Sequence, residues 1–304
     1  MLSAVIIPAG LLVDRLIGDP DSKYHPVALL GRVIGWWGRP ALWSKKSAKV
    51  AGVLLWTGTI VLFALPFFLF SAFAPWYFYV FIAPFLLKIC LAWRSLEEHT
   101  GRVVDAVSRD LNQGRENVSM MVSRDSRSLS REQVLSAGYE SMTENLVDSI
   151  ISPLFYFGLA GLTGAAVYRA ANTMDAMLGY KDERKDLGWW PARMDDLLNY
   201  IPARITGALL LCYFAWKGTF RQAWRTLRED GKKRPGYNGG IPMAIMAGGT
   251  GIAFDKPGVY TIGPGFRTLD EAGQEIFSAV RVVTLIFAGL LIIAVLLLQV
   301  LLIM

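Results

Sequence analysis

The chain of 304 residues is 53% hydrophobic, has a mean hydropathy of +0.37 and carries a formal net charge of +6. Long stretches without acidic or basic side chains, such as residues 282–304, place it among integral membrane proteins. The lysines and arginines lie in short loops beside these stretches, as the positive-inside rule describes, so the charge requires no nucleic-acid partner. Cys90 and Cys212 lie in apolar sequence without ligand-spaced neighbours, which argues against disulfides and zinc.

The first fifty residues predict two membrane-associated elements. A short apolar helix over residues 2–13 is followed by three polar candidates for one membrane edge, Asp14, Asp19 and His25, of which the last two precede prolines. Asp14 interrupts the apolar run, so we expect no cleaved signal peptide. Residues 32–49 interleave basic side chains with tryptophans and predict an interfacial helix.

The next elements read as a membrane hairpin and an amphipathic helix. Residues 50–73 and 76–93 are each long enough to span a bilayer core, and Ala74-Pro75 predicts a tight turn between them. Arginines follow the second span, and we assign that side to the cytoplasm. Apolar residues at helical spacing over residues 96–111 predict a further helix, which we expect Gln113-Gly114 to end.

Charged and amide side chains are densest in residues 122–204, where they surround an apolar segment. Ser130 and Gln133 predict a capping box at the start of a helix. Arg124 and Asp125 lie just before this helix. Ionisable groups beside apolar sequence of this kind are costly and usually functional, so we favour a functional site over solvated surface helices.

Within that helix, carboxylates recur every four residues. Glu140, Glu144 and Asp148 are predicted to stack on one helical face, with Ser141 and Asn145 beside them. Stacked carboxylates repel one another, so a cation or a basic ligand group is expected against them.

Two more polar faces follow the apolar segment. Tyr168, Asn172 and Asp175 recur at helical spacing, and Gly179 is expected to end that helix. Asp195 is four residues before Asn199. The other polar positions near this pair are Arg193, Asp196 and Arg204.

The topology of two apolar segments is open. Residues 149–168 are long enough to span, but their glycines also allow a re-entrant hairpin, and residues 205–216 are too short for a comfortable span. If both cross, residues 172–199 lie outside. If both are re-entrant, all the polar positions share the cytoplasmic side.

The C-terminal third predicts a basic interfacial helix over residues 217–234 and an uninterrupted span over residues 282–304. Between them, residues 238–251 are rich in glycine. Backbone N–H groups in such a stretch can approach an anion, although a plain flexible loop is at least as compatible with it, and no P-loop motif is present.

Together, several of these motifs resemble one family. They are Gly18-Asp19-Pro20, His25-Pro26-Val27, Ser123-Arg124-Asp125, Glu140-Ser141-x-x-Glu144-Asn145-x-x-Asp148, Pro153-Leu154-Phe155, Tyr168-x-x-x-Asn172-Thr173-Met174-Asp175, Ala192-Arg193-x-Asp195-Asp196 and Asn199-x-Ile201-Pro202-Ala203-Arg204. In this order they resemble the CobD/CbiB family of cobalamin biosynthesis, over nearly the whole chain. One motif departs: Asn238 and Pro242 are kept, but Met243 replaces the acidic residue usual after that proline.

The resemblance implies an enzyme of the cell membrane with its active site facing the cytoplasm. The family joins (R)-1-amino-2-propanol or its O-phosphate to the free carboxylate of adenosylcobyric acid, with ATP as the energy source. It implies adenosylcobinamide (phosphate) as product, an acyl phosphate as the activated carboxylate and Mg²⁺ on the phosphates. The partners it implies are these substrates and the lipid bilayer, with a second copy of the chain or other corrinoid-pathway membrane enzymes as candidate protein partners.

Roles for individual residues follow from the same resemblance. We expect Glu140, Glu144, Asp148 and Asp175 to be catalytic, and the last three of them to bind metal. Positions expected to bind substrate or phosphate are Asp14, Asp19, His25, Arg124, Asp125, Ser141, Asn145, Tyr168, Asn172, Arg193, Asp195, Asp196, Asn199, Arg204 and Asn238.

The expected fold is an all-α polytopic membrane protein with about four to six membrane segments, some of them re-entrant, and cytoplasmic amphipathic helices. We expect one catalytic domain over residues 1–304. Two other functions fit parts of the pattern: a transporter of a polar substrate, because broken apolar segments with buried charges also line transport pathways, and a non-catalytic signalling protein of the AmpE type.

Overall fold

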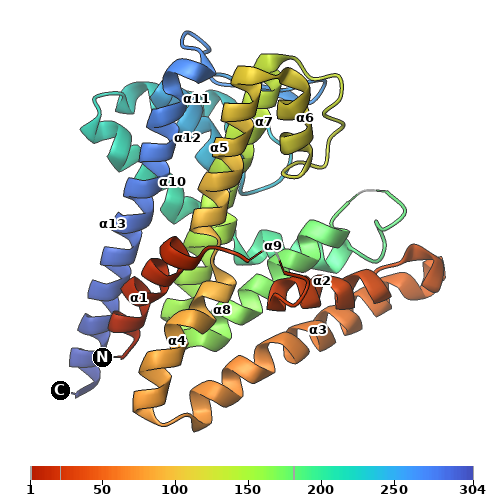
Figure 1. Cartoon of the computed structure of the whole chain (residues 1–304), viewed down its shortest axis with the longest axis vertical. Coiled ribbons are helices and arrows are strands. Elements are labelled where there is room, and N and C mark those ends of the chain that lie inside the picture. The colour runs from red at the N-terminus through yellow and green to blue at the C-terminus, as the bar shows by residue number, and fades with distance from the viewer. Residues whose placement is uncertain (1, 21, 181, 304) are drawn as a thin grey trace. The chain divides into compact units, whose positions relative to one another are not determined.

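The structure, a computed structural model, describes residues 2–20, 22–180 and 182–303. Helices dominate it, and the strands in the described part of the chain form one two-stranded hairpin (Figure 1). Four helical segments are long and apolar enough to cross a membrane, or five if the bent pair of residues 189–198 and 200–216 counts as one crossing. The predicted all-α polytopic membrane protein is therefore confirmed.

The helices form two compact units. Unit 1 comprises Met1–Ala92, Asp148–Asn199 and Ala288–Met304, and unit 2 comprises Trp93–Val147 and Tyr200–Phe287. The single catalytic domain expected from the sequence stays a prediction.

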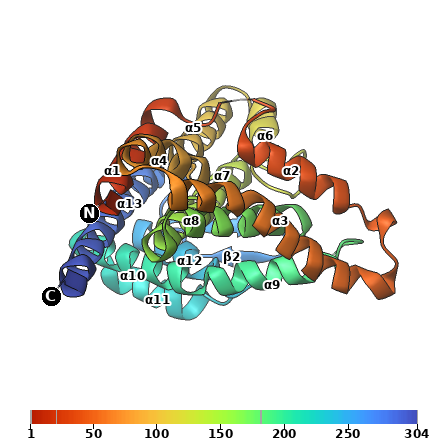
Figure 2. The same cartoon turned by 90° about the horizontal axis from the view of Figure 1, so that it is seen from below.

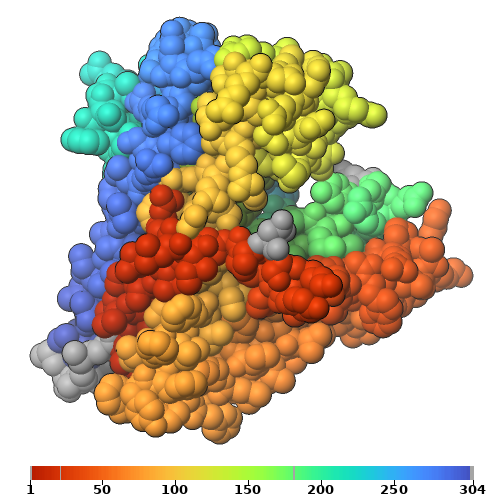
Figure 3. Space-filling view, in the orientation of Figure 1, coloured from red at the N-terminus to blue at the C-terminus, as the bar shows by residue number. Residues whose placement is uncertain are grey.

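Unit 1 contains the predicted membrane hairpin. Its helices are α1 (Leu2–Ile17), α2 (Pro26–Trp37), α3 (Lys45–Phe73), α4 (Trp76–Cys90), α8 (Ser152–Leu178) and α9 (Trp189–Leu198), together with the end of α13 (Leu269–Ile303). α3 and α4 are joined by the turn at Ala74-Pro75, as predicted, but they diverge from it (Figure 1). α4 packs along α1 (Figure 3). α3 packs along α8 (Figure 2).

The single interfacial helix predicted over residues 32–49 is wrong. α2 ends at Trp37, a 3₁₀ turn occupies Pro40–Leu42, and α3 begins at Lys45 behind the N-cap Ser44. Pro40 fixes its own φ and lacks an N–H, so the helix does not continue through it. Trp37 is buried and donates a 3.1 Å hydrogen bond to Thr59 of α3, so it packs in the core of unit 1 instead of facing an interface.

The glycines of the apolar segment reverse the chain. Ala160 and Gly161 leave helical geometry, and Gly161 adopts φ 60° and ψ −152°, a conformation that only glycine adopts readily. In a straight helix Tyr156 and Tyr168 would lie about 18 Å apart, but their rings stack with centroids 5.4 Å apart. α8 is therefore a helical hairpin, as the re-entrant alternative required.

Unit 2 contains the predicted capping box. Its elements are α5 (Trp93–Arg109), α6 (Leu111–Ser119), α7 (Arg131–Leu146), α10 (Tyr200–Trp216), α11 (Phe220–Asp230), α12 (Gly240–Thr250), β1 (Phe254–Lys256), β2 (Tyr260–Ile262) and the first part of α13. Ser130 and Gln133 exchange both capping hydrogen bonds at the start of α7. The amphipathic helix expected over residues 96–111 is α5, and the C-terminal span is α13.

Two glycine predictions in unit 2 are wrong for one physical reason. Gln113-Gly114 lies inside α6, and the stretch read as a loop or anion site over residues 238–251 is largely the buried helix α12. These glycines allow close packing: a Cβ on Gly114 would lie 2.4 Å from Val107 Cγ2, and one on Gly249 would lie 2.3 Å from the Phe214 ring.

Candidate functional site

The buried amide of Asn199 organises the polar group of unit 1. Its Oδ1 accepts hydrogen bonds from Ser152 Oγ at 2.6 Å and from Tyr168 OH at 2.8 Å, which come from the two arms of the α8 hairpin. All three residues are buried. Tyr156 donates to the carbonyl of Leu198 at 2.9 Å, so both arms also hold the end of α9.

Asp195 lies on the other side of this amide. Its carboxylate accepts hydrogen bonds from Asn172 Nδ2 at 3.1 Å and from Asn199 Nδ2 at 3.0 Å. Asp175 and Asp196 lie close enough to act electrostatically on Asp195. Three carboxylates and two amides therefore gather between α8 and α9, where the second and third polar faces that the sequence predicted meet.

The hairpin also brings Asp148 to this group. Ser152 and Tyr168 are equally distant from the turn at Ala160, and one helical turn further along the arms lie Asp148 and Asn172. Asp148 accordingly acts electrostatically on Tyr168. It lies in a π-helical turn, Val147–Ile151, so the regular spacing expected from Glu140 and Glu144 ends before it.

A second polar group in unit 1 connects the N-terminal loop with α4. Asp19 pairs with Lys88, a buried cation, and lies 3.7 Å from His25 Nε2. Burial lowers the pKa of His25; Asp19 opposes this shift, whereas Lys88 and Arg169 add to it. Arg169 has a buried Nε without a hydrogen-bond partner. These four side chains form a basic group around one carboxylate, while Asp14 is buried within α1.

Glu140 is the centre of the polar group in unit 2. Its Oε1 accepts from Ser136 Oγ at 2.6 Å and from Arg124 Nη2 at 3.1 Å, and its Oε2 accepts from Tyr260 OH at 2.7 Å. Burial raises the pKa of Tyr260, and the Glu140 carboxylate adds to this, so the phenol stays protonated and donates. The structure shows that both oxygens of the Glu140 carboxylate accept hydrogen bonds from the protein. The catalytic role expected for Glu140 from the sequence stays a prediction.

One turn along α7, Glu144 forms an ion pair with Arg234 from the segment after α11. The predicted cation against the stacked carboxylates is thus supplied by the chain. Asn145 donates to Ser141 within the same helix.

Arg204 is held in place by two contacts. Its guanidinium lies over the Tyr200 ring at 3.3 Å and donates to Asn238 Oδ1 at 3.2 Å.

Arg124 carries spare hydrogen-bonding capacity. Its side chain is 13% exposed, and its Nε and Nη1 are buried without partners. It lines a pocket of about 490 Å³ together with Arg115 of α6. Asp125 lines the same pocket. Hydrogen bonds from Arg127 lower the pKa of Asp125 to about 2, and both side chains are exposed.

The predicted site residues therefore fall into two sets. Unit 1 holds Asp14, Asp19, His25, Asp148, Tyr168, Asn172, Asp175, Arg193, Asp195, Asp196 and Asn199, and unit 2 holds Arg124, Asp125, Glu140, Ser141, Glu144, Asn145, Arg204 and Asn238. Within unit 1, Arg193 is exposed on α9 and makes no hydrogen bond or ion pair with the described residues. The single pocket expected to hold all of them stays a prediction.

Some residues of these groups were missed from the sequence. Arg169 directly follows Tyr168, and Lys88 was read only as a cation reaching the membrane surface. Arg234 was hidden among the basic residues of an interfacial helix. Tyr260 gave no signal, because the contact that places it depends on a β-hairpin far along the chain.

The carboxylates of these polar groups suit Mg²⁺ only in part. Among residues 2–20, 22–180 and 182–303, no group of three or more His, Cys, Asp or Glu side chains is arranged to hold a metal ion. Mg²⁺ is usually held by one or two carboxylates with substrate phosphates completing its shell. Asp175 with its acidic neighbours fits that arrangement better than a closed protein cage.

Comparison with known proteins identifies the family. A family model described as CobD/Cbib protein matches residues 7–283. "Probable cobalamin biosynthesis protein CobD" of Methanothermobacter thermautotrophicus is 38% identical over 291 residues, 94% of each chain. The protein of that name from Pyrococcus abyssi is 39% identical over 88% of each chain. No solved structure gives a significant match. The chain belongs to the CobD/CbiB family.

Proposed function

We propose that this protein acts in cobalamin biosynthesis by forming an amide bond between adenosylcobyric acid and (R)-1-amino-2-propanol or its O-phosphate. Family membership and the name shared by its relatives support the pathway. The observation that carries the reaction is the pairing of buried carboxylates with guanidinium groups beside apolar helices, above all Arg124 with Glu140. Such groups are costly beside a membrane and are usually kept for function.

The reaction requires an activated carboxylate. In the proposed step the free carboxylate of the corrinoid attacks the γ-phosphorus of ATP, which releases ADP and leaves an acyl phosphate. The amine nitrogen then attacks the acyl carbon, phosphate leaves, and a base takes the amine proton. ATP therefore supplies the energy and becomes ADP and phosphate.

Residues of unit 2 fit the handling of phosphate. Arg124 has N–H donors without partners beside a pocket, and guanidinium groups bind phosphate oxygens well. Glu140 keeps Arg124 oriented through its hydrogen bond, so we assign Glu140 to positioning in place of proton transfer. Arg204, fixed by Tyr200 and Asn238, offers a second preorganised guanidinium.

Residues of unit 1 fit the handling of the amine and of substrate amides. Asp148 and Asp175 lie with Asp195 around the Asn172 and Asn199 amides, and a carboxylate there would accept the amine proton. The half-buried Asn172 amide would hydrogen-bond amide groups of a corrinoid, whereas the buried Asn199 amide holds the two arms of α8. Mg²⁺, when bound with substrate phosphate, would neutralise phosphate charge, and Asp148 and Asp175 would hold it.

Purified protein tests this directly. It is incubated with adenosylcobyric acid, ATP, Mg²⁺ and each candidate amine, and the corrinoid is analysed by mass spectrometry. We expect a mass gain equal to the amine less one water, only with ATP present. Asp148→Asn should abolish product formation while the protein stays folded. Glu132→Gln, on the exposed first turn of α7, should form product like the wild-type protein. An unchanged corrinoid in every mixture would reject the proposal.

A further inference from the structure

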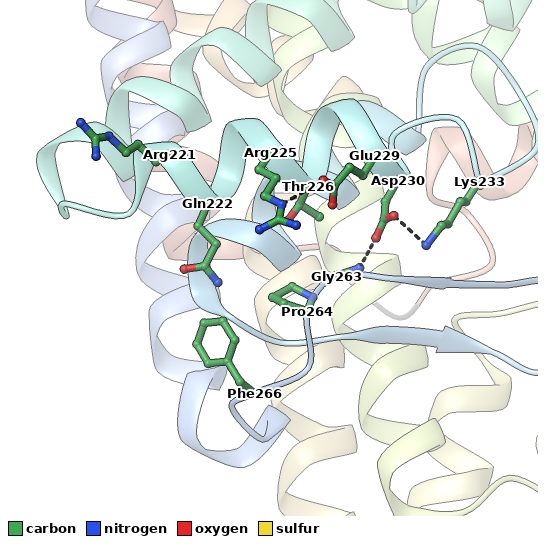
Figure 4. A pocket seen from close by; sticks show the side chains of 10 residues that line it. All are labelled: Arg221, Gln222, Arg225, Thr226, Glu229, Asp230, Lys233, Gly263, Pro264 and Phe266. Atoms are coloured by element: carbon green, nitrogen blue, oxygen red, sulfur yellow. Dashed lines mark hydrogen bonds and ion pairs between the residues drawn. The ribbon is translucent and has the colours of Figure 1, made fainter.

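A second pocket of unit 2 lies outside the residues assigned so far. It has a volume of about 710 Å³ and lies between α11 and the segment that follows β2 (Figure 4). This volume is within the range typical of small-molecule sites. Four features of its wall point to one class of ligand.

The first feature is an aromatic ring at the mouth. Phe266 is 64% exposed, and a Cβ on Gly251 would lie 2.4 Å from its ring, so the backbone at Gly251 supports the ring from one side. A large exposed aromatic side chain that is supported in this way offers a surface on which a planar group can stack.

The second feature is an unused amide donor. Gln222 Nε2 is buried and has no hydrogen-bond partner. The amide points toward the Phe266 ring (Figure 4). Because a buried donor without a partner destabilises a protein, a ligand with an acceptor in its ring plane would stabilise this arrangement.

The third feature is the balance of charge. Arg225 pairs with Glu229 in an exposed i,i+4 contact, which is weak enough for an anion to compete with it. Arg221 makes no hydrogen bond or ion pair with the described residues. Asp230 is already engaged, because it accepts from Gly263 N at 2.8 Å and from Lys233 at 2.6 Å.

The fourth feature is continuity with the Glu140 group within unit 2. Lys233 lines the pocket, and the next residue, Arg234, pairs with Glu144. Gly263 also lines it, and three residues earlier Tyr260 donates to Glu140. Gly263 directly follows β2, so its Cα lies about 10 Å from that of Tyr260, at 3.3–3.4 Å per residue.

We propose that this pocket binds the base and sugar of a purine nucleoside triphosphate, with its phosphates directed past Lys233 toward Arg234. The base stacks on Phe266 and accepts a hydrogen bond from Gln222, and Arg225, whose ion pair with Glu229 is exposed, attracts the phosphates. This assignment rests on the ATP dependence proposed above and gives it a location.

Titration calorimetry on the full chain in detergent tests the assignment, with ATP and inorganic tripolyphosphate as the two probes. Phe266→Ala should weaken ATP binding about ten-fold, since base–aromatic stacking supplies about 1–3 kcal/mol, and should leave tripolyphosphate binding unchanged. Phe266→Trp should retain ATP affinity, and Gln222→Met should weaken it by a smaller factor. Phe220→Ala, which removes another partly exposed ring on α11 but not from the pocket, is the control.

The outcomes separate this site from the proposed function. If wild-type protein binds ATP and Phe266→Ala binds it equally well, the pocket is wrong, whatever the mass assay shows. If wild-type protein binds no ATP, the pocket is also wrong, and the product assay alone decides the reaction. Loss of ATP affinity confined to the pocket variants establishes the site even if no corrinoid product forms.

Discussion

Tyr260 donates a 2.7 Å hydrogen bond to Glu140 Oε2 and so ties β2 to α7, although the two residues are 120 positions apart. Ser136 and Arg124 donate to the other oxygen, so both oxygens of this carboxylate accept hydrogen bonds from side chains of unit 2. A carboxylate held in this way orients its neighbours. Two substitutions measure how much stability each contact supplies.

Tyr260→Phe should lower the free energy of unfolding by about 2 kcal/mol, because it removes one hydrogen bond to a charged acceptor. Glu140→Gln should lower it further, by about 3 kcal/mol, because it leaves the Arg124 guanidinium, 13% exposed, without its carboxylate. Urea unfolding in detergent, with Glu132→Gln as the control, checks both. Wild-type stability in Glu140→Gln would show that the carboxylate is not a structural partner of Arg124.

A double-mutant cycle tests the Asn199 group. Ser152 and Tyr168 donate to the same Oδ1, so either donor alone still satisfies this buried acceptor. Ser152→Ala and Tyr168→Phe should each cost about 1 kcal/mol of stability, and the double variant should cost more than their sum, because it leaves the acceptor unpaired. Strict additivity in unfolding measurements would mean that the two hydrogen bonds are independent.

The helix periods and caps of this chain were predictable because they depend on neighbouring residues. Ser130 and Gln133 set the start of α7, and the four-residue spacing of Asp195 and Asn199 gave a contact that the structure contains. The partner of Glu144 was not predictable. The sequence required a cation, but only tertiary packing selects Arg234, ninety positions away.

The structural role of glycine was the hardest to predict, because a glycine that turns the chain and a glycine that allows close packing look the same in a sequence. Gly161 reverses the chain through a backbone conformation, whereas Gly249 sits inside a helix to admit a neighbouring ring. For the same reason, the glycines of residues 238–251 predicted a loop or an anion site where the structure has the helix α12.

Gly249→Ala tests the packing role. Its Cβ would lie 2.3 Å from the ring of Phe214, which is fully buried, so we expect a loss of roughly 1–3 kcal/mol from overpacking. Gly101→Ala in α5 meets nothing within 4 Å and should be neutral or slightly stabilising, since alanine favours helices. Thermal unfolding of the two variants provides the comparison, and equal behaviour would contradict the close approach of α12 and α10.

The pH dependence of stability should carry the signature of His25. Since its pKa is lowered in the folded protein, the unfolded chain binds this proton more readily, and stability should rise with pH up to about 6.5. His25→Asn should remove this part of the rise below about pH 6.5. His99→Asn, at the chain's other histidine, should keep it. The measurement is the melting temperature as a function of pH. If it rises with pH as steeply in His25→Asn as in the wild-type protein, His25 is not the group responsible.

The reversal at Ala160–Gly161 has a consequence for how the chain enters a bilayer. The second arm of the hairpin runs back alongside the first, so Ser152 and Tyr168 lie close together although sixteen residues separate them. In a bilayer the two arms would have to enter together, because both hydroxyls donate to the same Asn199 oxygen and gain that partner only once the arms meet the end of α9. A chain that reverses at Gly161 would return to the membrane face from which it entered, so this one glycine would decide on which side the acids that follow it emerge.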